Sequence, residues 1–187
     1  MGRDYTDEDL MVMYRDGDAS AFEILYHRHK GPVYRYILRH CGNAADAEEL
    51  FQDVWMKLIH ARERYEVSAK FTTYLYRIVH NHVIDHFRKS KSGTHEDCGK
   101  EPDAVPAPRG DQPERRVELG QQARSLLDAV AALPAEQRQV FLLKEEGGMS
   151  IREIAEVLGV NAETVKSRMR YALKKLRFAI GEIDGRK

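Results

Sequence analysis

The sequence predicts an all-α protein of two small helical domains joined by a flexible linker. Apolar residues recur at helical spacing in both halves of the chain, whereas the alternating pattern of strands is weak throughout. Residues 92–116 lack that periodicity and hold four of the six prolines and three glycines, a composition typical of an extended linker. We therefore place the domains at residues 1–91 and 114–187, with the linker at residues 92–113.

Five helices are predicted in the N-terminal domain. Thr6 and Asp9 have the spacing of a capping box that opens the first helix, and Gly17 ends it. Pro32 is expected in the first turn of a separate third helix, because proline lacks the N–H that would be unpaired there, and Gly42 stops that helix. The expected ranges are residues 6–17, 19–29, 32–41, 44–61 and 71–89.

The C-terminal domain is predicted to contain a helix-turn-helix. Ser150 and Glu153 form a second capping box, and Gly159 permits the left-handed conformation that ends the short helix. Asn161 can cap the helix that follows, which completes the motif. The expected helices cover residues 113–133, 135–146, 151–158 and 162–180.

The last of these helices has the pattern of a recognition helix. One stripe is apolar, and the opposite face carries cations and a serine. Between residues 161 and 177 there are six basic side chains and one acidic one, although the whole chain has a formal net charge of zero. The simpler interpretation is a solvated, charged C-terminal helix. The coincidence of the capped turn, the apolar stripe and the local positive charge favours DNA binding.

The remaining bulk features indicate a protein without a disulfide framework or a membrane segment. The two cysteines, Cys41 and Cys98, are far apart and form no CxxC pair, so the cytosol is the expected compartment. A lone Cys98 in the linker is more often incidental than a redox sensor. No apolar run has the length needed to span a bilayer, and we expect no membrane insertion.

The segment LPAEQRQVFLLKEEGGMSIREIAEVLGVNAETVKSRMRYALKKLR resembles the promoter-reading region 4 of sigma-70 family factors of the extracytoplasmic-function (ECF) group. Response-regulator DNA-binding domains share much of the same string, so the N-terminal half must decide between the two. The resemblance implies recognition of the minus-thirty-five promoter element. The candidate DNA contacts are Arg152, Thr164, Lys166, Ser167, Arg168, Arg170, Tyr171 and Lys174.

The string DAEELFQDVWMKLI, residues 46–59, has an acidic face opposite an apolar one. By periodicity alone this is an ordinary amphipathic helix. It also resembles the sigma region 2 segment that binds a coiled coil of core RNA polymerase. That resemblance implies polymerase contacts at Glu49, Gln52, Asp53, Trp55 and Ile59.

The string FTTYLYRIVHNHVIDHFRKSK, residues 71–91, resembles the sigma region that reads and opens the minus-ten element. Cations that follow phosphates and rings that stack on bases suit a separating strand. A base would be captured around residues 63–74. Tyr74 stands where family members commonly carry tryptophan, which is a departure from the family pattern. The candidate contacts are Lys70, Phe71, Tyr74, Arg77, Asn81 and Arg88.

An enzymatic interpretation has little support in the sequence. His82 and His86 have the spacing of a metal pair, but they fall within the apolar stripe, which favours buried, hydrogen-bonded histidines. A metal-dependent nuclease would depend on that pair alone. There is no glycine-rich nucleotide loop and no nucleophile elbow. We expect a protein that is not an enzyme and has no metal or other cofactor.

The resemblance in both halves predicts an ECF-type sigma factor that binds core RNA polymerase and promoter DNA, with an anti-sigma factor as a further partner. Each reading surface should be weak alone and effective only when the polymerase fixes their separation. The alternative is a stand-alone regulator with a helical sensor domain and a response-regulator-like reader. It should bind operator DNA unaided and should not bind polymerase.

Overall fold

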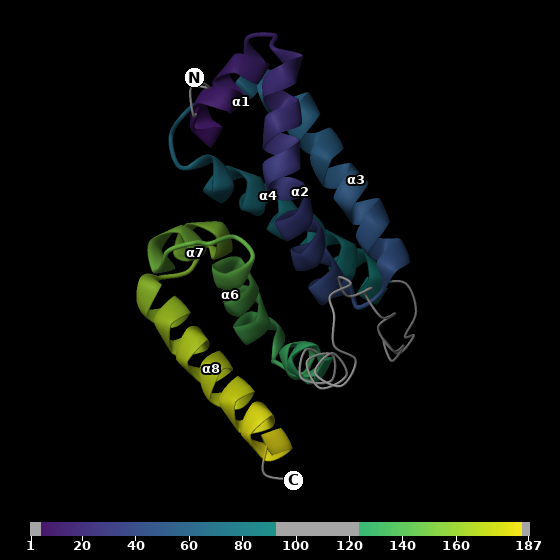
Figure 1. Ribbon diagram of the computed structural model, residues 1–187, viewed down its shortest axis with the longest axis vertical. Coiled ribbons are helices and arrows are strands. Elements are labelled where there is room, and N and C mark those ends of the chain that lie inside the picture. Colours follow the sequence, from purple (N-terminus) through teal and green to yellow (C-terminus); the bar gives the residue numbers. More distant parts are fainter. Residues whose placement is uncertain (1–4, 93–123, 185–187) are drawn as a thin grey trace, which may run out of the picture.

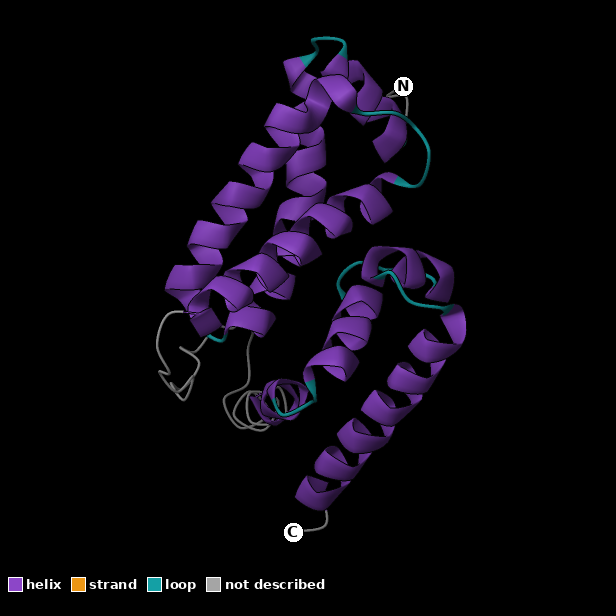
Figure 2. Cartoon of the chain, turned by 180° about the vertical axis from the view of Figure 1, so that it is seen from behind, coloured by secondary structure: helices purple, strands orange, loops and turns teal. Residues whose placement is uncertain are grey.

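The computed structural model describes residues 5–92 and 124–184, and it contains only helices and loops in those ranges (Figures 1 and 2). The helices are α1 (Asp7–Arg15), α2 (Ala19–Cys41), α3 (Ala44–Ala61), the 3-10 helix η1 (Arg62–Arg64), α4 (Phe71–Ser92), α6 (Ala135–Glu145), α7 (Ile151–Leu158) and α8 (Ala162–Asp184). Residues 124–131 form another helix before α6. The all-α prediction is confirmed. None of the described helices is long and apolar enough to cross a bilayer.

Most of the predicted linker lies outside the described residues. Residue 92 is the last residue of α4, and residues 93–113, including Cys98, are not among those described. The start of the helix expected over residues 113–133 also lies outside them. The helices predicted over residues 44–61 and 151–158 have the expected bounds.

The prediction of two helices around Pro32 is wrong. Helix α2 runs without interruption from Ala19 to Cys41, with Pro32 inside it. Proline removes one backbone donor and strains the preceding turn, but tertiary packing can offset that cost. Leu25 before the proline and Val33 and Ile37 after it are all fully buried, so one long helix keeps both halves of this apolar face in the core.

The N-terminal domain packs α2 against α1 and α3, with α4 crossing behind α2 (Figure 1). Aromatic rings fill the α2–α3 contact. Trp55 on α3 meets the rings of Phe22 and Tyr26 on α2 edge-on, at centroid distances of 6.0 and 4.9 Å. Tyr36 on α2 and Tyr76 on α4 form a third edge-on pair at 5.4 Å. Such pairs stabilise beyond the area they bury, which holds α3 and α4 in fixed positions.

The C-terminal domain is a small helical unit in which α6, α7 and α8 share one core. Val140, Leu142 and Ile154 are fully buried, as is Val165 on α8. Helix α8 packs along α6 with its apolar stripe and leaves its opposite face free of the other described helices (Figure 2). Helix α8 is therefore held by one side only.

His40 should make the stability of the fold depend on pH. Its Nδ1 donates a 2.8 Å hydrogen bond to the Tyr36 carbonyl, while Nε2 is buried and has no hydrogen-bond partner among the described residues. Burial is the main cause that lowers the His40 pKa to about 4; the hydrogen bond to Tyr36 opposes this shift, and the nearby Arg138 and His80 contribute to it. Because the unfolded state binds this proton first, stability should be constant above pH 6.5 and fall between about pH 6.5 and 4, by about 3 kcal/mol.

Urea titrations across that pH range test this prediction. The His40→Gln variant should show a flatter fall of the unfolding midpoint than the wild type. His27→Gln, which replaces an exposed histidine on the same helix, serves as the matched control and should keep the wild-type slope. Equal slopes for the wild type and His40→Gln would show that another group controls the acid transition.

Candidate nucleic-acid interface

The turn that presents α8 is built from local contacts. The Glu153 backbone N–H donates to the Ser150 hydroxyl at 3.4 Å, and the Ser150 N–H donates to the Glu153 carboxylate at 2.7 Å. Gly159 ends α7 with a φ of 65°, in the left-handed region, and the Asn161 side chain accepts from the Thr164 N–H at 2.7 Å. The predicted caps of the helix-turn-helix are confirmed.

The exposed face of α8 carries most of the predicted minus-thirty-five contacts. Lys166, Ser167 and Arg170 are exposed in its first turns. The Arg170 guanidinium stacks over the Tyr171 ring at 5.3 Å, which keeps the exposed ring and the cation together. The residues exposed on this face are Lys166, Ser167, Arg170, Tyr171, Lys174, Arg177 and Phe178.

Two of the predicted cations already have partners within the chain. Lys166 pairs with Glu163 at 2.7 Å, with both side chains more than half exposed. Arg168 lies at the edge of the face, where it pairs with Glu136 of α6 at 2.9 Å and is only 22% exposed. Surface pairs of this kind contribute little stability and exchange readily with phosphate. Because only 22% of its side chain is exposed, Arg168 is less available than its neighbours.

Sequence reasoning placed Arg177 on this basic face but missed Phe178. Phe178 is 69% exposed, the largest exposure among the large apolar side chains of the described residues. It stands seven residues after Tyr171 and therefore on the same side of α8. This spacing was the available signal, since two aromatic residues two turns apart extend the basic face toward its C-terminal end.

Helix α7 and the start of α8 supply the other two candidates. Arg152 is exposed in the first turn of α7, beside the capping box. Thr164 is half-buried at the start of α8, with its backbone N–H already bonded to Asn161. Only the Thr164 side chain can therefore contribute to a new contact.

Helix α4 presents a second polar face. Lys70, Arg77, Asn81 and Arg88 fall within about 40° of each other around the helix at 100° per residue. All four side chains are exposed, and Arg88 pairs with Asp85 at 4.0 Å. Tyr74 lies beside this face and is half-buried, with its ring 5.2 Å from that of Tyr65.

The prediction that Phe71 contacts DNA is corrected by its burial. Its side chain is fully buried, and its ring packs 5.4 Å from the His29 ring. The Phe71 backbone N–H donates to the Glu8 carboxylate at 2.6 Å, so Glu8 of α1 satisfies a donor at the start of α4. Phe71 therefore anchors the helix in the core.

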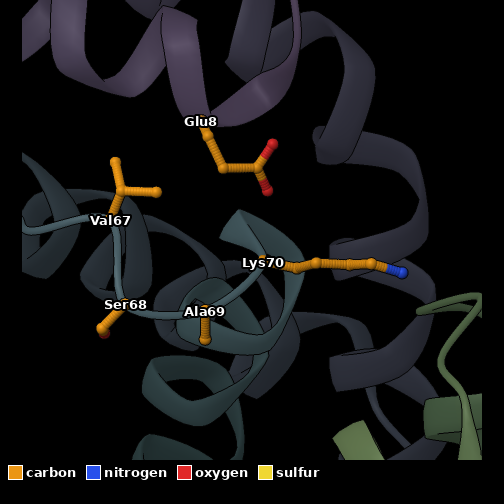
Figure 3. Close-up of a pocket in the computed structure, with 5 residues that line it drawn as sticks. All are labelled: Glu8, Val67, Ser68, Ala69 and Lys70. Atoms are coloured by element: carbon orange, nitrogen blue, oxygen red, sulfur yellow. The ribbon is translucent and has the colours of Figure 1, made fainter.

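The loop before α4 borders an open hollow of about 420 Å³ (Figure 3). Val67, Ser68 and Ala69 form one side, and Glu8 faces them from α1. Lys70 also lines the hollow, at the end of the same loop. The loop that lines the hollow belongs to residues 63–74, the segment that sequence reasoning assigned to base capture.

Helix α3 exposes a polar stripe on its outer side. Glu49, Gln52 and Asp53 are exposed, and Ile59 is half-buried. Met56 is 49% exposed in the same stripe, four residues after Gln52, and sequence reasoning missed it although the helical spacing was available.

Trp55 is corrected from a surface contact to a core residue. It is 5% exposed, and three aromatic rings surround it. Its position on α3 turns it toward α2, where apolar burial is more favourable than exposure to water. The outer stripe of α3 therefore offers no contact through this side chain.

Two histidines of α4, His82 and His86, contact carboxylates of α3. His82 contacts Asp53 at 3.1 Å and Lys57 at 2.6 Å, and His86 lies 3.8 Å from Asp46. Burial, followed by the nearby Lys57, lowers the His82 pKa. The spacing of His82 and His86 is explained by these two contacts with Asp53 and Asp46, which join α4 to α3. Among the described residues, no group of three or more potential ligands is arranged for a metal ion.

Comparison with known proteins identifies both halves of the chain. Residues 25–93 match the Sigma-70 region 2 family, and residues 123–176 match the Sigma-70, region 4 family. RNA polymerase sigma factor CarQ of Myxococcus xanthus is 32% identical over 179 residues, which cover 93% of this chain and 97% of CarQ. ECF RNA polymerase sigma factor SigW of Bacillus subtilis is 28% identical over 169 residues, covering 87% of this chain and 90% of SigW.

Among solved structures, the sigma factor RpoE in complex with the anti-sigma factor NepR from Bartonella quintana matches with a TM-score of 0.69. Its sequence identity is 20%, and the match covers 86% of this chain and 96% of that chain, a likeness that shows the shared fold. The two family matches follow the order of the two predicted domains, and the CarQ match extends across both. The chain therefore belongs to the extracytoplasmic-function group of the sigma-70 family of RNA polymerase sigma factors.

Proposed function

We propose that the two domains of this sigma factor, residues 1–91 and residues 114–187, have different functions. The first binds core RNA polymerase through α3 and reads the minus-ten element through α4. The second reads the minus-thirty-five element through α8. The observation that carries the proposal is the exposed basic face of α8, which is presented by a fully capped helix-turn-helix in the same chain as a region 2 match.

At the minus-thirty-five element, the first turns of α8 are suited to base edges and the later cations to phosphates. Lys166, Ser167 and Arg170 stand at the exposed N-terminal part of the helix, and Lys174 follows one turn later. Arg152 is placed to bind a phosphate from α7. This arrangement matches the general way in which a helix-turn-helix enters the major groove.

At the minus-ten element, the exposed cations of α4 would follow the backbone of the displaced strand. The hollow beside the loop before α4 would hold an unpaired base. Tyr74 follows this loop in the first turns of α4. Strand opening is then driven by the free energy of capturing bases, and the chain performs no covalent chemistry.

Core polymerase and an anti-sigma factor are the proposed protein partners. Glu49, Gln52 and Asp53 are exposed on α3, and the resemblance of this helix to the polymerase-binding segment of sigma region 2 supports a polymerase contact there. RpoE, which has the same fold, was solved with the anti-sigma factor NepR, and this supports an inhibitor of the same class here. The polymerase operates in the cytosol, which is the compartment we propose.

Run-off transcription tests this function directly. Purified chain mixed with core polymerase and a library of promoter sequences should produce specific start sites, whereas the chain or the core enzyme alone should not. Specific operator binding by the isolated chain, with no association with core polymerase, would instead support the stand-alone regulator.

A further inference from the structure

Helix α1 holds both ends of the loop that precedes α4. Where the loop begins, Arg15 Nη1 donates a 3.2 Å hydrogen bond to the Tyr65 carbonyl. Where it ends, the Glu8 carboxylate accepts from the Phe71 backbone N–H at 2.6 Å. The match to sigma-70 region 2 begins at residue 25, so α1 lies outside it. Two hydrogen bonds from α1 therefore fix a loop whose residues 66–70 are all exposed.

Aromatic packing fixes the same two ends of the loop. Tyr65 is 2% exposed, and its ring lies edge-on to the rings of Phe71 and Tyr74, at centroid distances of 6.5 and 5.2 Å. The ends of the loop thus belong to the core, and only its middle is open to solvent. A loop that is already ordered loses little conformational freedom when it binds a ligand, which favours a selective contact.

Glu8 offers an acceptor to the hollow beside this loop. It faces residues 67–69 from α1 (Figure 3). Its Oε1 binds the Phe71 N–H, whereas its Oε2 accepts no hydrogen bond from the described residues. Lys70, the cation among the residues that line the hollow, pairs instead with Glu153 at 2.8 Å. One oxygen of Glu8 is therefore available to a ligand.

The neighbouring carboxylates of α1 have other contacts. Asp7 pairs with Arg28 and with His29, each at 2.7 Å. Asp9 completes the capping box at the start of α1. Of the three acidic side chains in the first turn of this helix, only Glu8 lines the hollow.

A carboxylate in a hollow that receives DNA must meet a donor. Phosphates repel it, and covering it without a hydrogen-bond partner costs free energy. An ionised carboxylate only accepts hydrogen bonds, and its two oxygens together have about four acceptor positions, so the bond to Phe71 leaves capacity for another. Glu8 therefore favours a base that presents N–H groups.

The four bases differ in the donors that they present. Cytosine and adenine each carry an exocyclic amino group, and guanine carries an amino group beside a ring N–H. Thymine has one ring N–H between two carbonyl oxygens, and those oxygens would face the carboxylate. An unpaired base exposes this edge to the protein that captures it. The carboxylate should therefore separate the three amino-bearing bases from thymine.

We propose that Glu8 is a specificity-determining residue of the minus-ten reader: its Oε2 accepts a hydrogen bond from the amino group of an unpaired cytosine, adenine or guanine and disfavours thymine. The inference rests on the function proposed above, because it requires that the hollow receives a base. It adds α1 to the surface that reads DNA.

The simpler alternative is that Glu8 only supports the start of α4. Glu8→Gln separates the two roles at nearly constant volume. The amide oxygen can still accept from the Phe71 N–H, whereas the amide nitrogen replaces Oε2 with a donor. This variant should keep the wild-type melting profile and lose the preference for amino-bearing bases. Glu8→Ala removes both roles and should lower transcription from every promoter.

Run-off transcription by holoenzyme, assembled from the full chain and core polymerase, tests the proposal. Each of the four bases is placed in turn at every minus-ten position of the non-template strand, opposite a mismatched template strand, so that pairing strength does not contribute. At one position the wild type should prefer an amino-bearing base over thymine by at least about fivefold. Glu8→Gln should reduce that ratio to about one or less, since its amide can donate to thymine.

Two controls assign the effect to the predicted hydrogen bond. Glu23→Gln makes the same change at an exposed position on α2 and should keep the wild-type ratio. At the selective position, the preferred base is also replaced by its analogue without the amino group: 2-pyrimidinone for cytosine, purine for adenine or hypoxanthine for guanine. The analogue should lower wild-type transcription by at least about fivefold and leave that of Glu8→Gln unchanged.

The proposal is rejected if no minus-ten position disfavours thymine in the wild type, or if a folded Glu8→Gln variant keeps the wild-type ratio. Equal loss of transcription with all four bases in Glu8→Gln would also reject it, since Glu8 would then act only as a support for α4. These results leave the proposed function intact, because specific transcription persists in the wild type. Absence of specific transcription by the wild-type holoenzyme would instead reject the proposed function, and this inference with it.

Discussion

Replacing Gln52 and Asp53 together with alanine is expected to weaken binding to core polymerase by at least about tenfold, or about 1.4 kcal/mol. Both side chains are exposed on α3, and Asp53 contacts His82 of α4 while 55% of its own side chain remains exposed. Removing a charged contact at the centre of an interface affects mainly the dissociation rate. Fluorescence anisotropy with labelled chain and core enzyme measures this loss.

The fold should tolerate this double change. Exposed positions away from caps and cores alter stability by no more than about 0.5 kcal/mol, and loss of the exposed Asp53–His82 contact adds at most about 1 kcal/mol. Glu145→Ala removes an exposed carboxylate from the other domain and should bind polymerase as the wild type does. If the double variant retained wild-type affinity with an intact melting profile, the outer stripe of α3 would not be the polymerase surface.

Reversing the charge of Lys166 and Arg170 together is expected to abolish transcription that depends on the minus-thirty-five element. Both residues stand on the exposed face of α8. A good contact to a base edge contributes about 1–3 kcal/mol, and repulsion between the new carboxylates and phosphate adds to the loss. Lys144→Glu, on α6, applies the same charge reversal at an exposed site outside this face and should be nearly neutral.

The single variant Arg170→Ala separates the two kinds of contact. A base contact predicts relaxed specificity at one promoter position. A phosphate contact instead predicts uniformly weaker binding and a slope of log binding constant against log salt concentration that is smaller by about one. Holoenzyme assayed on promoters randomised in the minus-thirty-five element, at several potassium chloride concentrations, distinguishes them. Unchanged selectivity and unchanged salt dependence would remove Arg170 from the interface.

The elements that the sequence predicted well depend on local contacts. The capping boxes at Thr6 and Ser150 join residues three positions apart, so their pattern alone indicates the helix starts. The exposed face of α8 follows from helical spacing in the same way. The misplaced residues, Phe71 and Trp55, are buried because other helices cover them, and those helices are distant in sequence.

The amino-acid sequence by itself determined the helices, the helix-turn-helix, the location of the charged faces and the family, because each depends on residues within a few turns of one another. Only the tertiary structure decided that α2 continues through Pro32 and that Glu146 meets Arg35 and Arg39, which are 111 and 107 residues away. Periodicity carries no information about such pairs, since it describes which face of a helix is polar but not which distant surface that face will meet.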